Sequence, residues 1–544
     1  MKHVKLKGAE LLNNPKYNKD TAFSAAEREA FGLEGLVPPA IDTLERQLER
    51  VGHHLDAKSS DLEQYIYLMS LAGRNETLFY KTLMSDPARF VPIVYDPTVA
   101  YACLAFGHIF RHSSGMYLTR DMKERYLEVF RNWPVKDVRF ICVSTGGRIL
   151  GLGDIGANGM GIPIGKLQLY TACAAVPPES LLPVLLDIGT TNAPLRADPL
   201  YLGLRQPPPE DDEVDAIADA FVAAANEAFP GVCIHFEDWK GVDAMRLLDR
   251  YRDKILCYND DIQGTASVVI AGLTTAMQIK REKLTDQRFL FLGAGSAGLG
   301  ISNMIVSALV QQGLSEEEAR ERIWLMDSKG LIESGRQDIN RWKRRFAHEA
   351  KASTSLLEVV KTFKPSVLIG VSTCGGLFTD EVIKEMARIN QQPIIFPLSN
   401  PTERAECTPE AAYTHSGGRA LYAAGVQFPD VELHGKRFHP SQANNFYIFP
   451  AVSLAVYATR PQRITDAMFI AAAAATADQV DQASRDKGML YPLQANILET
   501  EVTTAVRVAE FIFEQGQASV ERPVDIRAWI EGMLYSPEYR NLLD

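Results

Sequence analysis

A glycine-rich turn between an apolar segment and a helical one is the feature that most restricts how this chain folds. The apolar segment 289–292 leads into the pattern G-x-G-x-x-G, and apolar residues then recur with helical spacing over 301–309. Strand, turn and helix in this order are typical of a Rossmann-type unit, in which the pyrophosphate of a dinucleotide lies against the helix N-terminus. We therefore predict that NAD or NADP is bound by Gly293, Gly295, Ser296, Ala297 and Gly298.

Polar residues also follow other short apolar segments, at the points where strands are expected to end. Parallel sheets bind ligands outside the carboxyl ends of their strands, so these residues are expected to share one active-site rim. The strand-end residues are Glu237-Asp238, Asn259-Asp260-Asp261, Asp327 and Ser399-Asn400.

Helical patterns dominate the first hundred residues and alternate with strands afterwards. At 40–48, for example, the apolar residues Ile41, Leu44 and Leu48 fall on one helical face. From residue 138 onward, short apolar runs are separated by helical stretches, as in parallel βα units. The predicted fold class is therefore multidomain α/β, with a Rossmann-type dinucleotide-binding domain and a helical N-terminal domain.

Asp327 ends the strand expected after the glycine turn, where a carboxylate hydrogen-bonds the adenine-side ribose. Ser328 and Lys329 follow it, and Lys343 lies further on among other basic residues. Cations at this place would hold a 2′-phosphate and favour NADP over NAD. A basic surface helix explains the same residues equally well, so composition alone leaves this choice open.

Two acidic pairs, Glu237-Asp238 and Asp260-Asp261, come directly after apolar segments. Clustered carboxylates repel one another unless a cation lies among them. Because all-oxygen ligation suits Mg²⁺ or Mn²⁺, the sequence predicts a divalent-metal site. Helix N-capping is the alternative, above all for Asp261.

A second glycine-rich stretch, 151–166, ends at Lys166. It contains G-x-G-x-x-G, but no helix is expected directly after it, and it lacks the Ser or Thr that would make it a phosphate-binding loop. A lysine on such a partly apolar loop can lose solvent and act as a base. A surface lysine without a chemical role is the alternative.

The composition argues against some classes of function. The chain has 57 Lys and Arg against 68 Asp and Glu, and its net charge of -11 opposes binding to nucleic acid or to anionic membranes. The seven cysteines include no C-x-x-C pair, and the basic start lacks a following apolar stretch, so we expect a cytoplasmic protein with reduced thiols. We expect no segment to approach the roughly 18–20 apolar residues of a membrane span.

These motifs resemble the malic enzyme family over nearly the whole chain. The resemblance implies oxidative decarboxylation of L-malate to pyruvate and CO₂, with reduction of NADP or NAD and a requirement for Mg²⁺ or Mn²⁺. The matching segments are 78–80 (LFY), 92–95 (PIVY), 148–154 (RILGLGD), 159–166 (GMGIPIGK), 236–238 (FED), 259–265 (NDDIQGT), 398–402 (LSNPT) and 444–445 (NN).

The same resemblance implies roles for individual residues. Lys166, tuned by Asp260, would take the proton of the malate hydroxyl, and Tyr95 would protonate C3 of the enol. Arg148 would bind a substrate carboxylate. Asn400 and Asn445 would complete the substrate contacts, with Asn400 also facing the cofactor. The implied metal ligands are Glu237, Asp238 and Asp261. Residues resembling those of NADP-preferring members are Ser328, Lys329 and Lys343, which makes NADP the expected cofactor and NAD the alternative.

The implied architecture divides the chain into four parts. They are a helical N-terminal domain (1–113), a central α/β substrate domain (114–259 and 445–516), a Rossmann domain (260–444) and a C-terminal tail (517–544). Family members are usually dimers or dimers of dimers, so we expect a homodimer or homotetramer. Arg50 and Arg74 fall where some relatives bind an activating dicarboxylate, and this regulation is left open.

Three positions depart from the family pattern. Asp96 stands where Thr is usual, Gly147 where an acidic residue is usual, and His235 where Gln is frequent. At Asp96 the sequence resembles the malolactic enzymes, which are relatives that convert malate directly to lactate and CO₂ with bound NAD. Malolactic activity is therefore the first alternative. An inactive nucleotide-binding homologue is the second, but the complete set of Tyr95, Lys166 and the four acids argues against it.

Overall fold

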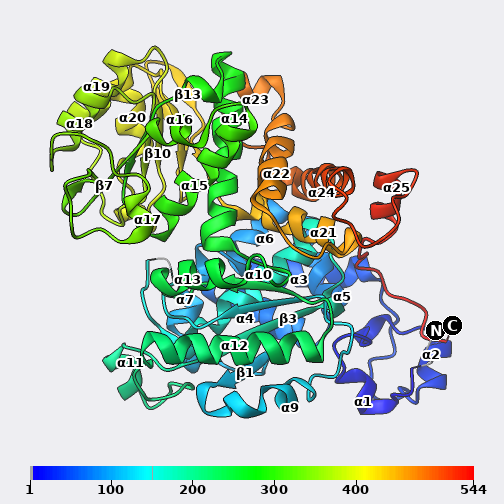
Figure 1. The fold of residues 1–544 in the computed structure, drawn as a ribbon. Coiled ribbons are helices and arrows are strands. Elements are labelled where there is room, and N and C mark those ends of the chain that lie inside the picture. Colours follow the sequence, from blue (N-terminus) through cyan, green and yellow to red (C-terminus); the bar gives the residue numbers. More distant parts are fainter. Residues whose placement is uncertain (1–3, 150, 544) are drawn as a thin grey trace.

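Two sheets, each covered by helices, organise the chain in the computed structural model, which describes residues 4–149 and 151–543 (Figure 1). The first sheet is parallel and has the order β1-β3-β2-β4-β5. Its strands are β1 (Met116–Thr119), β2 (Phe140–Ser144), β3 (Leu181–Asp187), β4 (Cys233–Glu237) and β5 (Cys257–Asn259). Every residue of β2, β4 and β5 is buried, as expected for a parallel sheet covered on both faces.

The second sheet has the order β14-β11-β10-β9-β6-β7-β8 and is parallel except for the antiparallel β7–β8 pair. Its strands are β6 (Phe289–Leu292), β7 (Ile323–Asp327), β8 (Gly330–Leu331), β9 (Val367–Gly370), β10 (Ile394–Pro397), β11 (Leu421–Ala424) and β14 (Ser441–Gln442). The chain runs outward from β6 through β7 and then returns to β9 on the other side of β6. The strand order therefore reverses between β6 and β9, which is where doubly wound sheets bind dinucleotides.

Gly293 lies at this reversal point, directly after β6. Its φ is +119°, and a Cβ added there would stand 2.3 Å from the carbonyl oxygen of Val371, just after β9. Only glycine fits both the backbone angle and the close approach. The α/β fold class with a Rossmann-type domain is confirmed.

The described part of residues 4–113 contains helices joined by loops and no strand. They are α1 (Gly8–Leu12), α2 (Ala25–Ala30), α3 (Leu44–Asp56), α4 (Asp61–Ala72), α5 (Glu76–Ser85), α6 (Pro87–Val94), α7 (Thr98–Leu104) and α8 (Phe106–Ile109). The helix predicted over 40–48 begins only at Leu44, because the Thr43 hydroxyl caps it by accepting from the Arg46 N–H at 3.3 Å. Ile41 therefore lies outside the helix and is 46% exposed.

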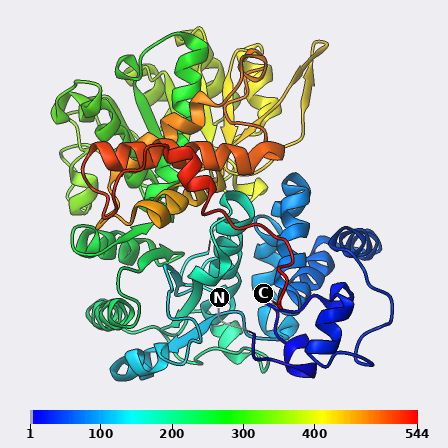
Figure 2. The same cartoon turned by 90° about the vertical axis from the view of Figure 1, so that its right-hand side faces the viewer.

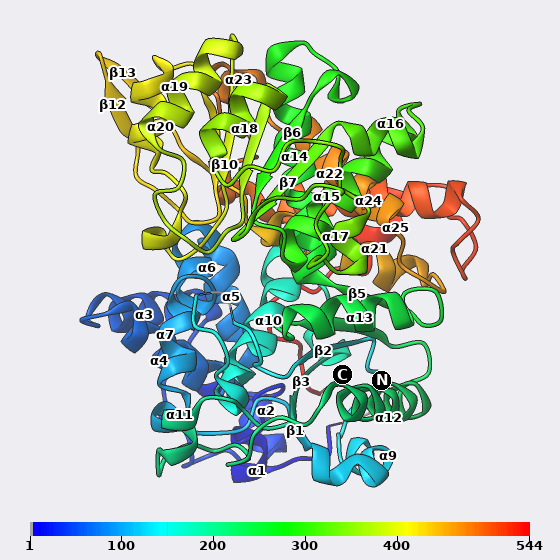
Figure 3. The same ribbon diagram turned by 60° about the vertical axis from the view of Figure 1, so that its left-hand side comes forward.

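The other helices cover the sheets and join them. Those of the first sheet include α9 (Tyr126–Phe130), α10 (Gly161–Ala174), α11 (Ala193–Ala197), α12 (Asp211–Ala228) and α13 (Gly241–Tyr251). Those near the second sheet are α14 (Thr265–Lys280), α15 (Ser296–Gln311), α16 (Glu316–Glu321), α17 (Arg341–Arg344), α18 (Leu356–Phe363), α19 (Asp380–Ile389) and α20 (Pro409–Ser416). The two parts meet where α13 packs against α15 (Figure 3).

The chain returns from the second sheet to the first through its last helices, drawn in orange and red in Figure 2. These are α21 (Phe449–Thr459), α22 (Asp466–Asp478), α23 (Gln482–Asp486), α24 (Ile497–Glu514) and α25 (Ile526–Glu531). Helix α21 packs against α10, and α22 packs against α14. The end of the chain reaches the N-terminal helices, where the Tyr539 hydroxyl donates to Gln47 Oε1 at 2.6 Å. The domain boundaries given above remain predictions.

One stretch, Asp260–Lys280, is long and apolar enough to cross a membrane by length and composition. The prediction that no segment approaches this length is therefore wrong. In the structure 78% of its apolar window is buried, because α14 packs against α15 and α22. Such burial is what a core helix shows.

Candidate active site

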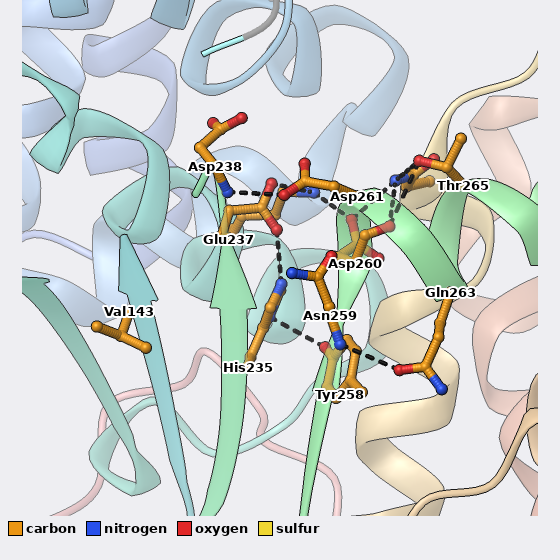
Figure 4. Close-up of polar contacts among 12 residues, drawn as sticks. Val143, His235, Glu237, Asp238, Tyr258, Asn259, Asp260, Asp261, Gln263 and Thr265 are labelled. Atoms are coloured by element: carbon orange, nitrogen blue, oxygen red, sulfur yellow. Dashed lines mark hydrogen bonds and ion pairs between the residues drawn. The ribbon is translucent and has the colours of Figure 1, made fainter. Parts of the chain in front are cut away.

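The acidic residues predicted to bind metal gather at the carboxyl edge of the first sheet (Figure 4). Glu237 ends β4, and Asp260 begins one turn of π-helix, Asp260–Gly264, that connects β5 to α14. Because β4 and β5 are parallel neighbours, the residues that follow them meet at one edge. Carboxylate oxygens of Glu237, Asp238 and Asp261 lie within 4.8 Å of one another.

The backbone holds these acids close together. Asp238 has a φ of +52°, an unusual conformation for a residue with a side chain. Its N–H donates to Asp261 Oδ2 at 2.8 Å, which ties the two strand ends together. Glu237 and Asp238 are only 3% and 5% exposed, whereas Asp261 is half-buried.

Burial and mutual repulsion make the ionised cluster costly on its own. Burial, with the neighbouring carboxylates, raises the pKa of Asp238 and Asp261 well above the usual range, and burial raises the pKa of Glu237 to about 8 although Lys166 opposes the shift. Counting Asp260, four carboxylates outnumber the cations Lys166 and Arg148 by two charges. A divalent cation would balance that difference, so the donor set fits Mg²⁺ or Mn²⁺.

Lys166 lies in α10 and is 1% exposed. The expected placement on a loop and the alternative of a surface lysine are both wrong, whereas the expected loss of solvent is confirmed. Its Nζ stands 2.5 Å from Asp260 Oδ2 and 3.1 Å from Glu237 Oε1. Burial lowers the pKa of Lys166, but Asp260 and Glu237 outweigh burial and hold that pKa well above its usual range.

Tyr95 directly follows α6. It reaches Lys166 because Gly165 of α10 allows α6 and α10 to approach closely. A Cβ on Gly165 would stand 3.1 Å from the carbonyl oxygen of Val94 and 3.3 Å from Tyr95 Cδ2, so α6 packs tightly on α10. The Lys166 Nζ lies 5.2 Å from the centre of the Tyr95 ring. Burial raises the pKa of Tyr95 well above its usual range, and burial raises the pKa of the neighbouring Asp96 to about 6.

Asn445 joins the cluster from the segment after the second sheet. Its Nδ2 donates to Asp260 Oδ2 at 2.8 Å and to Thr265 Oγ1 at 3.1 Å. Asp260 Oδ2 therefore accepts hydrogen bonds from both Lys166 and Asn445, while the buried Oδ1 of Asp260 has no hydrogen-bond partner among the described residues. Asp260 is thus positioned to orient the lysine.

Arg148 connects the two halves of the site. Its N–H donates to the Asp238 carbonyl oxygen at 3.3 Å, and its guanidinium donates to Ser296 Oγ, the first residue of α15, at 3.2 Å. Asn400 lies beside the same loop, since a Cβ on Gly151 would stand 3.7 Å from the Asn400 carbonyl oxygen. Within the described parts of the chain, no hydrogen bond links the Asn400 side chain to the acidic cluster.

The glycine turn and Asp327 form the cofactor side. Gly295 is the N-cap of α15, and a Cβ on Gly298 would stand 2.4 Å from the Gly293 carbonyl oxygen. Asp327 ends β7, as predicted, and accepts from Lys343 Nζ at 2.7 Å. Lys329 instead pairs with Asp338 at 2.8 Å, and Ser328 is exposed.

Two residues at the cofactor side were missed by sequence reasoning. Arg336 donates to both oxygens of Asp327, at 2.8 and 3.2 Å. Burial would raise the pKa of Asp327, but Arg336 and Lys343 hold it below its usual value. The buried Glu406 accepts from Ser372 Oγ at 2.7 Å and from Ser399 Oγ at 2.5 Å, which joins the loops after β9 and β10. Arg336 follows Asp327 by nine positions and was detectable as a basic neighbour, but Glu406 gives no local signal.

The structure joins a dinucleotide-binding sheet to another sheet, and the edge of that other sheet holds buried acids and a buried lysine. These features define an α/β enzyme of the nucleotide-dependent class. Family models identify that class further: the malic enzyme N-terminal domain matches residues 72–252, and the malic enzyme NAD binding domain matches residues 262–513. The chain belongs to the malic enzyme family, as its motifs suggested.

Whole-chain relatives agree with these matches. The NADP-dependent malic enzyme of Phaseolus vulgaris is 46% identical to this chain, over 98% of this chain and 91% of its own. That of Anas platyrhynchos is 44% identical, over 99% of this chain and 97% of its own. A mitochondrial NAD-dependent malic enzyme of Ascaris suum is 43% identical, over 99% of this chain and 85% of its own. The solved Entamoeba histolytica malic enzyme has a TM-score of 0.60 at 22% identity, covers 93% of this chain and 91% of its own, and shows the same fold.

Proposed function

We propose that this chain catalyses the oxidative decarboxylation of L-malate to pyruvate and CO₂ with reduction of NADP, and less effectively of NAD. The observation that carries the proposal is the buried Lys166, paired with Asp260 beside three clustered carboxylates at the edge that faces the dinucleotide-binding sheet. Similar chains of 43–46% identity are named NADP- or NAD-dependent malic enzymes.

Glu237, Asp238 and Asp261 would hold Mg²⁺ or Mn²⁺. When bound, this metal would polarise the malate hydroxyl and offset the negative charge that develops during loss of CO₂, while the nicotinamide accepts a hydride from C2. The Arg148 guanidinium, between the acidic cluster and the start of α15, would bind a malate carboxylate and orient C2 toward the cofactor side.

Lys166 would act as the base that removes the hydroxyl proton. A lysine does this only as a neutral amine, and its ammonium form is stabilised here by Asp260 and Glu237. With a cation bound, Glu237 would stabilise the ammonium form of the lysine less strongly. The pKa of Lys166 would then fall, and the neutral amine would form more readily. Asp260, held by Asn445, keeps the amine oriented.

Tyr95 would supply the proton to C3 after CO₂ leaves. Its ring lies beside Lys166, and Phe449 lies on the lysine as well, with the Lys166 Nζ 4.5 Å from its ring centre. These two rings keep water away from the amine, so that protons pass between Lys166, Tyr95 and the substrate.

The preference for NADP rests on the cations around Asp327. Lys343 and Arg336 both reach this carboxylate, and Lys329 lies two residues after it in the chain. A 2′-phosphate beside the ribose would draw on Lys343 and Arg336, whereas NAD would use the Asp327 carboxylate alone.

The proposal is tested by mixing the purified chain with L-malate and Mn²⁺ and supplying NADP or NAD separately. Reduction of NADP with equimolar pyruvate is the expected result. Faster reduction of NAD would overturn the cofactor preference alone. Lactate without net cofactor reduction would show that the chain is malolactic, as Asp96 suggested.

A further inference from the structure

A buried histidine lies directly behind the acidic cluster, and the mechanism above does not use it. His235 and Glu237 are two residues apart on β4, so their side chains share one face of the strand. His235 Nε2 stands 2.7 Å from Glu237 Oε2 (Figure 4). The ring is fully buried, with 0% of its surface exposed.

Two tyrosine hydroxyls face the other nitrogen of the same ring. Tyr170 from α10 and Tyr258 from β5 place their hydroxyl oxygens 2.9 and 3.0 Å from His235 Nδ1. The position of Tyr258 follows from the sheet register, which pairs it with His235, and the two rings stack with centres 4.5 Å apart. The hydroxyls also contact each other at 2.5 Å, and that of Tyr258 lies 3.5 Å from Ser453 Oγ.

The hydrogen-bond roles in this network have one consistent assignment at the imidazole. A carboxylate that ligates a cation offers only acceptors, so Nε2 must carry the hydrogen that is donated to Glu237. Nδ1 must then accept from one tyrosine, while the second tyrosine donates to the first. Every polar atom around the ring is satisfied in this way, and the tautomer is fixed by the tyrosines.

We propose that His235 is a positioning residue that fixes the Glu237 carboxylate for the metal, through an Nε2–H tautomer imposed by Tyr170 and Tyr258. The inference rests on the proposed function, because it assumes that Glu237 is a metal ligand. His235 holds Oε2 while Lys166 holds Oε1, so the carboxylate cannot rotate about its terminal bond. Loss of such an outer hydrogen bond typically weakens metal binding by about 10–100-fold.

Matched variants separate positioning from simple filling of the space. Glutamine places its amide nitrogen near the position of Nε2, so His235→Gln keeps the donor to Glu237. Asparagine places its amide nitrogen near Nδ1, so His235→Asn keeps polarity and contact with the tyrosines but loses that donor. His235→Leu removes both hydrogen bonds.

The test is Mn²⁺ binding to the full chain without substrate, measured from the electron paramagnetic resonance signal of free Mn²⁺. We expect His235→Asn and His235→Leu to raise the Kd about 10–100-fold, and His235→Gln to stay within about threefold. NADP binding, measured by protein fluorescence, should match the wild type in His235→Gln and His235→Asn, and both metal-free variants should still unfold in one cooperative transition.

Two results would overturn the inference while leaving the proposed function intact. One is wild-type Mn²⁺ affinity in His235→Asn, and the other is an equal loss in His235→Gln and His235→Asn. If His235→Leu does not fold, the Gln and Asn variants still decide the question. Absence of saturable Mn²⁺ binding in the wild type would overturn the metal site itself, and the inference with it.

Discussion

Replacing Lys166 by Met tests the proposed base and its surroundings together. Met keeps a long unbranched side chain but removes the charge, leaving Asp260 and Glu237 without their shared cation at 2.5 and 3.1 Å. Loss of a general base typically lowers kcat about 10²–10⁴-fold, which is about 2.7–5.4 kcal/mol of barrier. Removing one partner of a buried ion pair costs about 3–5 kcal/mol of stability, and Mn²⁺ should restore part of this by binding the uncompensated carboxylate of Glu237.

The assay is malate-dependent cofactor reduction, with thermal unfolding recorded at a fixed scan rate with and without Mn²⁺. Lys254→Met is the control, because Lys254 is exposed and precedes β5, whereas the acidic cluster follows it. We expect the control to behave as the wild type. Turnover by Lys166→Met at a near wild-type rate would refute the assignment of the base, and an unchanged unfolding temperature would refute the energetic argument.

Four further changes probe separate parts of the account. Asp261→Asn should raise the Mn²⁺ Kd by more than about a hundredfold, since outer hydrogen bonds alone are worth about 10–100-fold; an unchanged Kd would remove Asp261 from the ligands. Tyr95→Phe should lower pyruvate formation about 10²–10⁴-fold without changing the Kd for NADP, and full activity would exclude Tyr95 as the acid. Lys343→Gln should raise the KM for NADP about tenfold, equal to about 1.4 kcal/mol, and leave the KM for NAD unchanged; equal effects on both cofactors would contradict a contact with the 2′-phosphate. Burial raises the pKa of Glu501 well above 4.5, so its contribution to stability is present below pH 4.5 and is lost as the pH rises through the folded pKa. Glu501→Gln keeps the acceptor for the Ala451 N–H and should therefore raise the unfolding temperature increasingly between pH 5 and 8; a gain independent of pH would contradict this reasoning.

The parts of the site that follow from local sequence were predictable. A glycine turn flanked by a strand and a helix predicts a dinucleotide-binding turn. Gly293, directly after β6, has the backbone angle and the close backbone approach that such a turn requires. The acidic pairs were predictable because the ends of parallel strands gather at one edge. The start of α16 is equally local, since Ser315 and Glu318, in the pattern S-x-x-E, form a capping box.

The environment of Lys166 was not predictable, because its causes are distant in sequence. The run 159–166 is rich in glycine and suggests a loop, yet it continues into α10, a helix buried on all sides. Its glycines are contact points: a Cβ on Gly161 would stand 2.7 Å from Cys103 Sγ. Packing of α6 and α7 on these small residues brings Tyr95 to the lysine, and no pattern within the segment reveals those partners.

Glu406 and the tyrosines around His235 were missed for the same reason. Each acts through a partner set by sheet register or by a loop crossing, such as the pairing of His235 with Tyr258 across β4 and β5. Sequence reasoning identified His235 only as a departure from the family pattern. Its position behind Glu237 required the structure.

The most direct test of the central claim is turnover of L-malate that carries deuterium at C2, with Mn²⁺ and NADP, followed by mass analysis of every product. Hydride transfer from C2 at this site predicts deuterium in the reduced cofactor and unlabelled pyruvate in equal amounts. Deuterium at C2 of lactate with no net reduced cofactor, or no turnover at all, would contradict it.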